Sequence, residues 1–541
     1  MQCTALGLAV ALAIAVFGPP GVDRPAHLFQ TWAFSHFGMQ IWNNYWYAGR
    51  YQFVTYSLLF YPAAAVVGIT PLSVCSAGIL AGSFAALARG QWGRAAGTPA
   101  LVFAISATTV LMVFGTYPFL TGLALAAAGL VAARRTSWPA LALFAAAAAA
   151  VSPLAFLMLL VVLATRVAAD PRPLAALRRY RRHTVAIGVL LAMGIAWSHA
   201  FWSASFYAYP VSDLATVVGF SAAGLYLTGI RGRAADLRAF FVLYLLLNVA
   251  AFLIPSPLGS NAIRLFTIGG APILWIAARA GRLRPRPQVA MIVATALAVQ
   301  VAPAVADAYN AGAEPAASPG FWTPVVRFLG DHGRPVARVE VVATWGHWEA
   351  YYLAKDGISL ARGWYRQDDY PENQVLYRGD DLTPAAYRAW LHRMGVRYVM
   401  LPTGPLDYTA LSEASLLRSG RSGLPVVARL RNWTIYRTPN PTPLLTAMSG
   451  GGAASVVRID PQDVRIHVTR PGTFLLRLRY MPYWQAPAGV CLTASRDGMT
   501  RVTALEAGNV RLGIDGSLTA IESAIEGGGT RCQATPVGSS G

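Results

Sequence analysis

Residues 119–135, FLTGLALAAAGLVAARR, show the pattern that decides the fold: an apolar run followed at once by two arginines. A helix that crosses the hydrocarbon core of a bilayer needs a run of roughly 15 to 20 such residues. Comparable runs begin near Thr4, Phe53, Pro71, Ala100, Pro139, Thr184, Leu214, Ala239, Ala262 and Val289. This spacing predicts a polytopic α-helical membrane protein with about 11 to 12 transmembrane helices.

The composition agrees with a membrane protein and divides the chain. Of its 541 residues, 55% are hydrophobic and 13% are charged, and the mean hydropathy is +0.44. Only four of the 24 acidic residues precede Asp307, and the other 20 begin there. We therefore predict a membrane domain over residues 1–306, with a first external loop at 19–52, followed by an aqueous region.

The arginines give a topology, because basic residues collect on the cytoplasmic side of a membrane protein. They form the clusters Arg89/Arg94, Arg134/Arg135, Arg166 through Arg182, Arg231/Arg233/Arg238 and Arg279 through Arg286. All of these can be cytoplasmic if residues 53–68 add no full crossing and residues 139–166 turn back at Ser152-Pro153. Asp23, Tyr117 and the whole region after Asp307 are then external.

Several other classes of protein are disfavoured. The net charge of +20 comes from arginines between apolar runs, where they meet membrane lipid headgroups, so no nucleic-acid partner is expected. No C-x-x-C pair, H-E-x-x-H, Walker loop or G-x-S-x-G occurs in a supporting context. The first 18 or so residues are either a cleaved signal peptide or an uncleaved helix. The uncleaved helix is favoured, because no basic region precedes the run.

Asp23 is the only carboxylate in the first 169 residues, within Gly21-Val22-Asp23-Arg24-Pro25-Ala26-His27. An ionisable side chain at the end of a transmembrane helix is a functional-site hypothesis by default. If a helix begins at Pro25, His27 projects to the same side as Asp23. We therefore predict Asp23 and His27 as catalytic residues.

An unusual concentration of aromatic and amide side chains follows between residues 18 and 69. Rings at this density form an aromatic belt at a membrane interface, or they stack on sugar faces while asparagine pairs with hydroxyl groups. Beside Asp23 and His27, the second interpretation predicts substrate contacts from Trp42, Asn43, Asn44, Tyr47 and Tyr56.

The order of a hydrophobic helix, G-x-D-x-P-x-H, W-N-N-Y-W-Y-x-G and Tyr56-Ser57-Leu58-Leu59-Phe60-Tyr61 resembles the GT-C superfamily of multi-spanning glycosyltransferases. The chain is particularly similar to a bacterial branch with a large external C-terminal region. There, segments like Gly363-Trp364-Tyr365-Arg366-Gln367 and Gly395-Val396-Arg397-Tyr398-Val399-Met400-Leu401-Pro402 recur. The resemblance implies a multi-pass enzyme of the bacterial cytoplasmic membrane, with its C-terminal region on the external, periplasmic face.

The same resemblance implies an activity. A sugar would pass from a polyprenyl-phosphate donor to an envelope glycan, lipid or protein acceptor, with Asp23 as the base. Many members carry a second acid nearby, whereas Arg24 and Pro25 follow here, and this departure disfavours a metal site in the first loop. A divalent cation, Mg²⁺ or Mn²⁺, with unknown ligands stays an open option elsewhere. The competing class is a non-enzymatic envelope-biogenesis protein or a lipid-linked-glycan transporter.

A leaving lipid phosphate needs positive charge or hydrogen bonds at the external helix ends. Arg24, His27, His199 and Arg264 are the candidate cations, and Asn261 precedes Arg264 where a helix N-terminus favours an anion. Arg264 could equally snorkel to the interface, and His199 could be a helix-end histidine. Asp213 is either a helix N-cap or a second acid of the site.

Residues 307–440 predict an external α/β domain. Strands are expected at 339–342 and 398–401, and a helix from Pro384 to about Met394 with Thr383 as its cap. His347 and Arg366 are candidate substrate contacts. The nearby acids Asp368 and Asp369 either coordinate a divalent ion or lie on a solvated loop.

Residues 441–541 predict an external β-sandwich, because apolar and polar residues alternate at 464–468, 474–480 and 510–514 between turns. Trp484 fits either a carbohydrate-binding surface or the sandwich core. Cys491 and Cys532 both fall in this domain, where an external location permits a disulfide.

Overall fold

The computed structural model describes all residues except 135–136, 230–233, 284–285, 334, 450 and 526–541. The chain forms two compact units. The first, which we call the membrane unit, comprises Met1–His27, Tyr56–Trp197 and Ser205–Ala313. The second, which we call the sheet unit, comprises Leu28–Thr55, Ser198–Ala204 and Glu314–Gly541.

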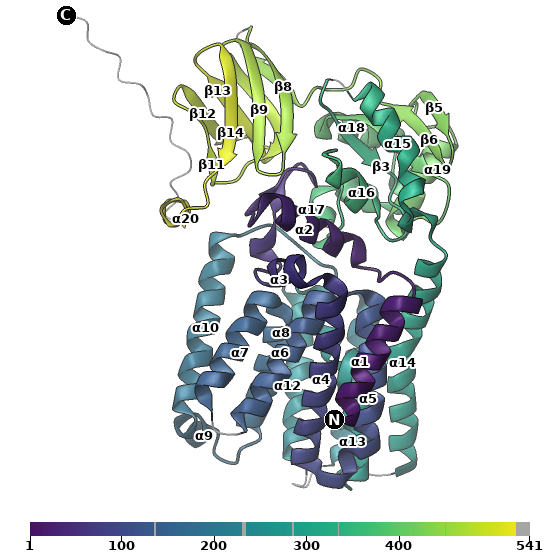
Figure 1. The fold of residues 1–541 in the computed structure, drawn as a ribbon, viewed down its shortest axis with the longest axis vertical. Helices are drawn as coiled ribbons and strands as arrows, with labels where there is room; N and C mark the ends of the chain where they lie inside the picture. The colour runs from purple at the N-terminus through teal and green to yellow at the C-terminus, as the bar shows by residue number, and fades with distance from the viewer. Residues whose placement is uncertain (135–136, 230–233, 284–285, 334, 450, 526–541) are drawn as a thin grey trace, which may run out of the picture. The chain divides into compact units, whose positions relative to one another are not determined.

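Helices make up nearly all of the membrane unit, and several run side by side in Figure 1. In chain order they are α1 (Gln2–Phe17), α3 (Phe60–Val67), α4 (Ile69–Trp92), α5 (Gly97–Phe114), α6 (Tyr117–Ala133), α7 (Trp138–Val151), α8 (Pro153–Ala168), α9 (Pro173–Arg179), α10 (Arg181–Ala200), α11 (Val211–Thr228), α12 (Ala235–Leu253), α13 (Arg264–Arg279) and α14 (Arg286–Gly312). Helix α2 (Arg24–Phe37) contains the boundary between the two units.

Both conditions set by the arginine topology are met. The segment after Phe53 forms only a short 3-10 turn and the eight-residue α3. Residues 139–166 form two helices that separate at Ser152, whose side-chain oxygen accepts a hydrogen bond from the Ala155 N–H and so caps α8.

By length and composition, six helical segments of the described chain could cross a membrane, or seven if the bent pair α8 and α9 forms one span. This criterion treats α4 and α5 as one segment and sets aside the shorter apolar helices α1, α6 and α7. Each of these helices lies in a segment predicted as a span. The protein is therefore a multi-pass membrane protein.

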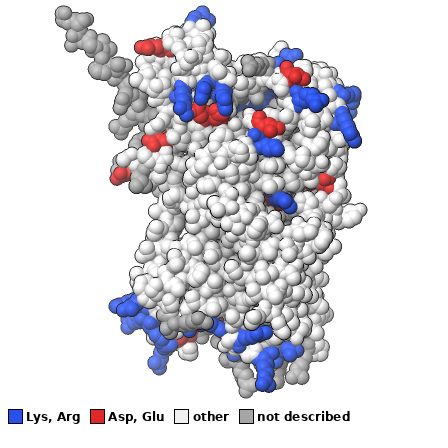
Figure 2. Space-filling view, viewed as in Figure 1, with Lys and Arg blue, Asp and Glu red and all other residues white. Residues whose placement is uncertain are grey.

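One end of the membrane unit gathers the arginines. Arg134, after α6, donates to the Ala86 carbonyl of α4 (3.4 Å), and Arg282, after α13, pairs with Asp236 of α12 (3.3 Å). Figure 2 shows basic side chains at the foot of the bundle and a broad uncharged face above them. Of the predicted clusters, Arg135, Arg231, Arg233 and Arg284 lie outside the described residues.

The sheet unit contains an α/β part, as predicted. Its four-stranded sheet has the order β3-β4-β6-β5, with β3 and β4 parallel and the other neighbours antiparallel. The Thr383 hydroxyl caps α18, as expected. The elements are α15 (Pro319–His332), β3 (Arg338–Val341), α16 (Glu349–Lys355), α17 (Arg366–Glu372), α18 (Pro384–Met394), β4 (Val396–Pro402), α19 (Leu411–Arg418), β5 (Val426–Leu430) and β6 (Trp433–Arg437).

The predicted β-sandwich is also present. Its sheets have the orders β12-β13-β10-β7 and β11-β14-β9-β8. Trp484 is 1% exposed, so it belongs to the core and not to a carbohydrate-binding surface. The elements are β7 (Leu445–Ser449), β8 (Ala453–Asp460), β9 (Asp463–Arg470), β10 (Gly472–Arg479), β11 (Trp484–Gln485), β12 (Val490–Ala494), β13 (Met499–Ala504), β14 (Gly508–Ile514) and the terminal helix α20 (Leu518–Ile525).

Most of the predicted first external loop folds with the sheet unit. Its short strands β1 (Trp42–Asn43) and β2 (Arg50–Tyr51) form an antiparallel pair. The Asn44 N–H donates to the Pro461 carbonyl (2.9 Å), and the Leu360 N–H donates to the Tyr45 carbonyl (2.7 Å). The loop therefore connects the α/β part to the sandwich.

Candidate functional site

Asp23 is held by its backbone at the end of the bundle opposite the arginines. The N–H groups of Val22 and Asp23 donate to the carbonyls of Val113 (3.2 Å) and Phe114 (2.9 Å), the last residues of α5. Carbonyls at a helix C-terminus lack partners within the helix. The two bonds therefore satisfy the last carbonyls of α5 and the N–H groups of Val22 and Asp23. The position of Asp23 is thus tied to the end of α5.

Two glycines allow this close approach. Gly115 ends α5 in the left-handed conformation, with φ +71°. A Cβ on Gly21 would lie 2.6 Å from the Gly115 Cα and 2.8 Å from the Tyr117 hydroxyl. Because no real Cβ tolerates such distances, the two backbones can meet only at glycine. In the sequence, Gly21 stands out only as the first residue of the G-x-D-x-P-x-H motif, and Gly115 only as the residue that follows an apolar run.

Tyr117, the first residue of α6, completes the surroundings of the carboxylate. Its phenol is buried and interacts electrostatically with both Asp23 and Arg24. Asp23 and Arg24 are themselves partly exposed. A carboxylate, a guanidinium and a phenol therefore meet at an accessible edge of the membrane unit.

His27 lies next to this group but is uncharged. Its Nδ1 is 3.1 Å from the Tyr61 hydroxyl, and its ring centroid is 5.5 Å from that of Tyr117. Burial lowers the pKa of His27 to about 3, although a hydrogen bond to the Gly115 backbone acts in the other direction. A fully buried neutral imidazole does not supply the positive charge that the sequence suggested, so its role here is to pack the site.

The Arg264 and Asp213 side chains lie at the same end of the bundle as Tyr117. The Arg264 guanidinium, at the start of α13, lies 5.3 Å from the ring centroid of Phe119 in the first turn of α6. Asn261 precedes it, in a 3-10 turn. The Asp213 carboxylate accepts a hydrogen bond from Ser260. Pro210, not Asp213, is the N-cap of α11, which corrects the capping interpretation.

The two remaining candidates near the membrane have different surroundings. The Tyr56 ring stacks on Tyr61 at 6.4 Å and lies 6.2 Å from His27, so it belongs to the same aromatic cluster. His199 is exposed in the last turn of α10.

Trp42, Asn43, Asn44 and Tyr47 are buried in the sheet unit. The Trp42 indole donates to the Asn44 side-chain oxygen (2.9 Å), and the Asn43 side-chain oxygen accepts from the Tyr45 N–H (2.9 Å). The Tyr47 hydroxyl donates to the Tyr365 carbonyl (3.0 Å). Because all four side chains are buried and, apart from the Asn43 side-chain nitrogen, their polar groups bond to the protein itself, we assign them a structural role and not substrate contact.

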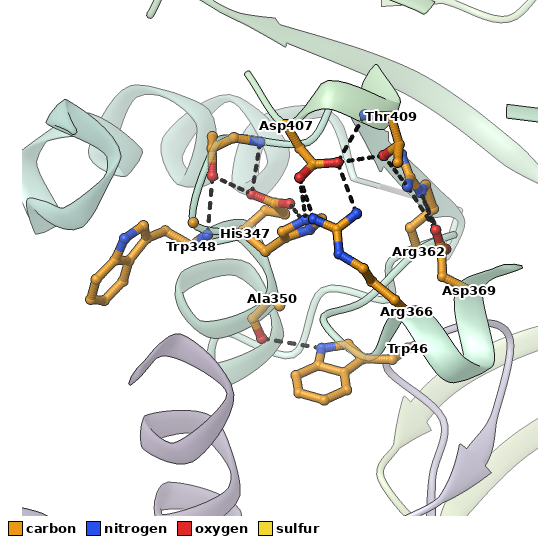
Figure 3. A network of polar contacts seen from close by, with 12 residues as sticks. Trp46, His347, Trp348, Ala350, Arg362, Arg366, Asp369, Asp407 and Thr409 are labelled. Atoms are coloured by element: carbon orange, nitrogen blue, oxygen red, sulfur yellow. Dashed lines mark hydrogen bonds and ion pairs between the residues drawn. The ribbon is translucent and has the colours of Figure 1, made fainter. Parts of the chain in front are cut away.

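His347 and Arg366 belong to a buried charge network in the sheet unit, with Asp407 between them (Figure 3). The His347 Nε2 lies 3.5 Å from Asp407 and its Nδ1 3.3 Å from Glu349. Arg366 holds both oxygens of Asp407, with Nη1 donating to Oδ1 at 3.2 Å. Burial alone would lower the pKa of His347, but the two carboxylates raise it to about 9.

Further acids surround this network. Burial raises the pKa of Glu314 to about 7, although its carboxylate accepts a hydrogen bond from the Gly346 N–H (2.9 Å). Glu340 and Glu413 are both buried. Burial and the nearby Glu413 carboxylate raise the pKa of Glu340 well above its usual value. The Tyr387 hydroxyl donates to Glu413 at 2.6 Å.

The acidic pair Asp368 and Asp369 does not lie on a solvated loop, because both residues belong to α17 and each pairs with an arginine. Arg362 binds Asp369 through two nitrogens, with Nη2 donating at 2.7 Å. Arg50 donates to Asp368 at 2.6 Å. Burial raises the pKa of Asp369, but the Arg362 charge outweighs this and leaves the pKa below its usual value.

A divalent cation does not fit the residues around Asp23. Within the described residues, no group of three or more His, Cys, Asp or Glu side chains is arranged to hold a metal ion. The side chain that follows Asp23 is the cation of Arg24, which repels a metal.

One half of the predicted disulfide can be described. Cys491 is disulfide-bonded, and Cys532 lies outside the described residues. Cys3 and Cys75, in α1 and α4, are free thiols.

No family model matches the chain, and no curated protein sequence matches it. One similar solved structure is the arabinofuranosyltransferase AftD from mycobacteria, with 14% identity, TM-score 0.46, and coverage of 96% of this chain and 57% of that one. Another is the archaeal oligosaccharyltransferase AglB from Archaeoglobus fulgidus, with an inhibitory peptide and a dolichol-phosphate, at 12% identity, TM-score 0.32, and coverage of 74% and 69%. The chain thus spans 57% of the length of AftD. At TM-scores below 0.5, the function has to be argued from this chain's own residues.

Proposed function

We propose that this protein is a GT-C-type membrane glycosyltransferase. It moves a sugar from a polyprenyl-phosphate donor to a glycan, lipid or protein acceptor of the cell envelope, on the external face of the bacterial cytoplasmic membrane. The observation that carries the proposal is the placement of Asp23. Its partly exposed carboxylate lies beside Arg24 and Tyr117, at the end of the membrane unit opposite the arginine clusters. Because basic clusters mark the cytoplasmic side, this end is external.

In the proposed reaction Asp23 is the general base. Its carboxylate takes the proton of the acceptor hydroxyl while that oxygen forms a bond to C1 of the donor sugar. The C1–O bond to the lipid phosphate breaks, and the phosphate leaves with the electron pair. A single carboxylate suffices, since a phosphate is already a good leaving group.

The leaving phosphate gains negative charge, and fixed cations lower the energy of the transition state. Arg24 is adjacent to Asp23 in sequence, and Arg264 begins α13 at the same end of the bundle. The neutral His27 leaves this role to the two arginines. We assign Arg24 to the reacting centre and Arg264 to the approach of the lipid phosphate.

The test compares envelope glycans by mass spectrometry in a deletion strain complemented with wild type, Asp23→Asn or Asp170→Asn. We expect Asp23→Asn to lower the amount of product by roughly a hundredfold or more, because the amide does not accept the proton. Asp170→Asn is the matched control. Asp170 lies between α8 and α9 at the arginine-rich end, and its side-chain oxygen accepts from the Arg172 N–H (2.9 Å), a bond that asparagine keeps.

Each outcome bears on the proposal. Full activity of Asp23→Asn at wild-type abundance would remove the base from the mechanism. Glycans that are identical in the deletion and wild-type strains would favour the alternative, a non-enzymatic or transport role.

A further inference from the structure

Helix α13, which begins at Arg264, is weak near its middle. Pro272 lies inside the helix and has no N–H, so it cannot donate to the carbonyl of Ile268 four residues earlier. Gly269 and Gly270 lie between these two positions, and glycine is among the least favourable residues in a helix interior. The local sequence therefore holds the first turn of α13, which carries Arg264, only weakly to the rest of the helix.

Gln300 of α14 supplies the missing hydrogen bond. Its Nε2 donates to the Ile268 carbonyl at 2.9 Å and to the Ser106 hydroxyl of α5 at 3.3 Å. Gln300 is 2% exposed, and its Oε1 has no hydrogen-bond partner within the described residues. A buried amide with one unsatisfied end costs free energy, which a leucine or methionine would avoid. Packing alone therefore does not account for a glutamine at this position.

The other end of the same turn is also anchored by a neighbouring helix. The Tyr244 hydroxyl of α12 donates at 3.0 Å to the carbonyl of Ile263, the N-cap residue of α13. Tyr244 is itself fully buried. Neighbouring helices thus hold the turn on both sides of Arg264, at Ile263 and at Ile268. Membrane proteins stabilise interrupted helices in this way, because adjacent helices satisfy the freed backbone groups.

We propose that Gln300 is a positioning residue that acts through Arg264. By donating to the Ile268 carbonyl, it fixes the first turn of α13 and so holds the Arg264 guanidinium at its end of the bundle. Arg264 is the cation assigned above to the approach of the lipid phosphate, so this inference rests on the proposed function. Gln300 then controls the recognition of a polyprenyl phosphate without touching it.

The test measures phosphate selectivity with the full chain in lipid nanodiscs. The probes are undecaprenyl phosphate and undecaprenol, which share the lipid chain and differ in the phosphate. The readout is the ratio of their dissociation constants, and we expect wild type to prefer the phosphate. Gln300→Met, which has a similar volume and no donor, should lower this preference about threefold to tenfold, the loss expected for one hydrogen bond. A general loosening of the fold would weaken both probes alike and leave the ratio unchanged.

Pro272→Ala provides a rescue, because an alanine N–H can donate to the Ile268 carbonyl within the helix. The double variant Pro272→Ala/Gln300→Met should therefore regain most of the wild-type preference. In an Arg264→Gln background, Gln300→Met should cause no further loss, since both changes act on one guanidinium. Gln288→Met is the matched control, because Gln288 is exposed in the first turn of α14 and should leave the ratio unchanged.

Gln300→Asn, whose amide is shorter by a methylene group, replaces Gln300→Met if the latter is not recovered folded, and it should lower the preference in the same direction. An unchanged ratio in a folded Gln300 variant would overturn the inference. So would a loss that Pro272→Ala does not restore, or a further loss in the Arg264→Gln background. Equal binding of both probes by wild type would also overturn it, whereas the transfer at Asp23 would still be decided separately by the glycan comparison.

Discussion

The two units differ in whether they bury charged side chains. In the described part of the membrane unit, no Asp, Glu, Lys or Arg is buried, and the buried polar groups are neutral, such as Gln300, Asn248 and the uncharged His27. The sheet unit encloses both signs of charge, including the ion pair of Arg362 and Asp369, which are 5% and 3% exposed. A helix in a bilayer finds no partner for a charge until it meets another helix, so charge is left to the helix ends. A fold in water can bury charge if tertiary contacts pair it.

The comparison therefore predicts where a mutation acts. In the membrane unit, the sensitive positions are those where backbones meet at the helix ends. In the sheet unit, they are the members of buried ion pairs.

The largest effect on stability should come from Arg362→Gln. This change leaves Asp369 buried without its cation, and breaking a buried pair costs about 3 to 5 kcal/mol. Thermal unfolding followed by hydrogen exchange should show early opening of peptides from the sheet unit, with α4 and α5 unchanged. A loss below about 1 kcal/mol would mean that Asn373 and Tyr377, which also donate to Asp369, suffice to hold the carboxylate.

A pH dependence follows from His347. Its folded pKa, about 9, lies above the usual 6.5, so its stabilisation is complete below pH 6.5 and is lost as the pH rises through 9. The shift corresponds to at most about 3 kcal/mol. Glu314, with its pKa raised to about 7, acts in the same direction at lower pH.

The measurement is the thermal midpoint of the sheet unit between pH 6.5 and 9. His347→Gln, which does not titrate, should flatten the curve over this window. If wild type and variant fall in parallel, the pH dependence comes from another group.

A smaller effect is expected for Gly115→Ala in the membrane unit. The left-handed conformation costs an alanine roughly 1 to 2 kcal/mol, and the new Cβ would lie 3.1 Å from the Gly21 Cα and 3.2 Å from the Asp23 nitrogen. Turnover should fall with stability, because Asp23 is displaced. Gly97→Ala at the start of α5, where a Cβ meets nothing within 4 Å, should leave both unchanged. Equal effects of the two changes would show that the Gly21–Gly115 contact does not position Asp23.

The smallest effect should come from Arg465→Gln on the sandwich. Arg465 is 57% exposed and lies 3.8 Å from Asp463. Exposed pairs contribute about 0 to 1 kcal/mol, so the midpoint should shift by less than about a third of the Arg362→Gln effect or not at all. A loss as large as that of Arg362→Gln would contradict the contrast between buried and exposed charge.

Much of the membrane unit could be predicted from the sequence, because hydropathy and arginine position act locally along the chain. The break between α7 and α8 at Ser152 and the limited length of α3 both followed from the arginine pattern. The site around Asp23 was harder. Asp23 stands out in the sequence as an isolated acid. The contacts of Gly21, Gly115 and Tyr117 around it depend on the packing of the ends of α1, α5 and α6, which the sequence does not show.

The sheet unit shows the opposite balance. The strands at β3 and β4 and the cap at Thr383 follow from local alternation and helix-start signals. The buried ion pairs could not be predicted in this way, since in the sequence Arg362 and Asp369 belong to a polar stretch that is typical of a surface. Trp42, Asn43 and Asn44 were predicted to contact substrate, and their position inside the unit depends on contacts with Asp460 and Ser359, which are hundreds of residues away in the chain.

By itself, the sequence determined that this chain is a multi-pass membrane protein with mixed and β-sandwich regions after it, and that Asp23 is the isolated acid of its first third. These properties depend on residues that are neighbours in the sequence, so periodicity and composition suffice to predict them. The tertiary structure alone decided that His27 is neutral, that the W-N-N-Y stretch is buried in the sheet unit, and that Glu349 and Asp407 pair with His347. Those outcomes depend on burial and on partners distant in sequence, which determine the free energy of a buried charge. Neither can be predicted from neighbouring residues.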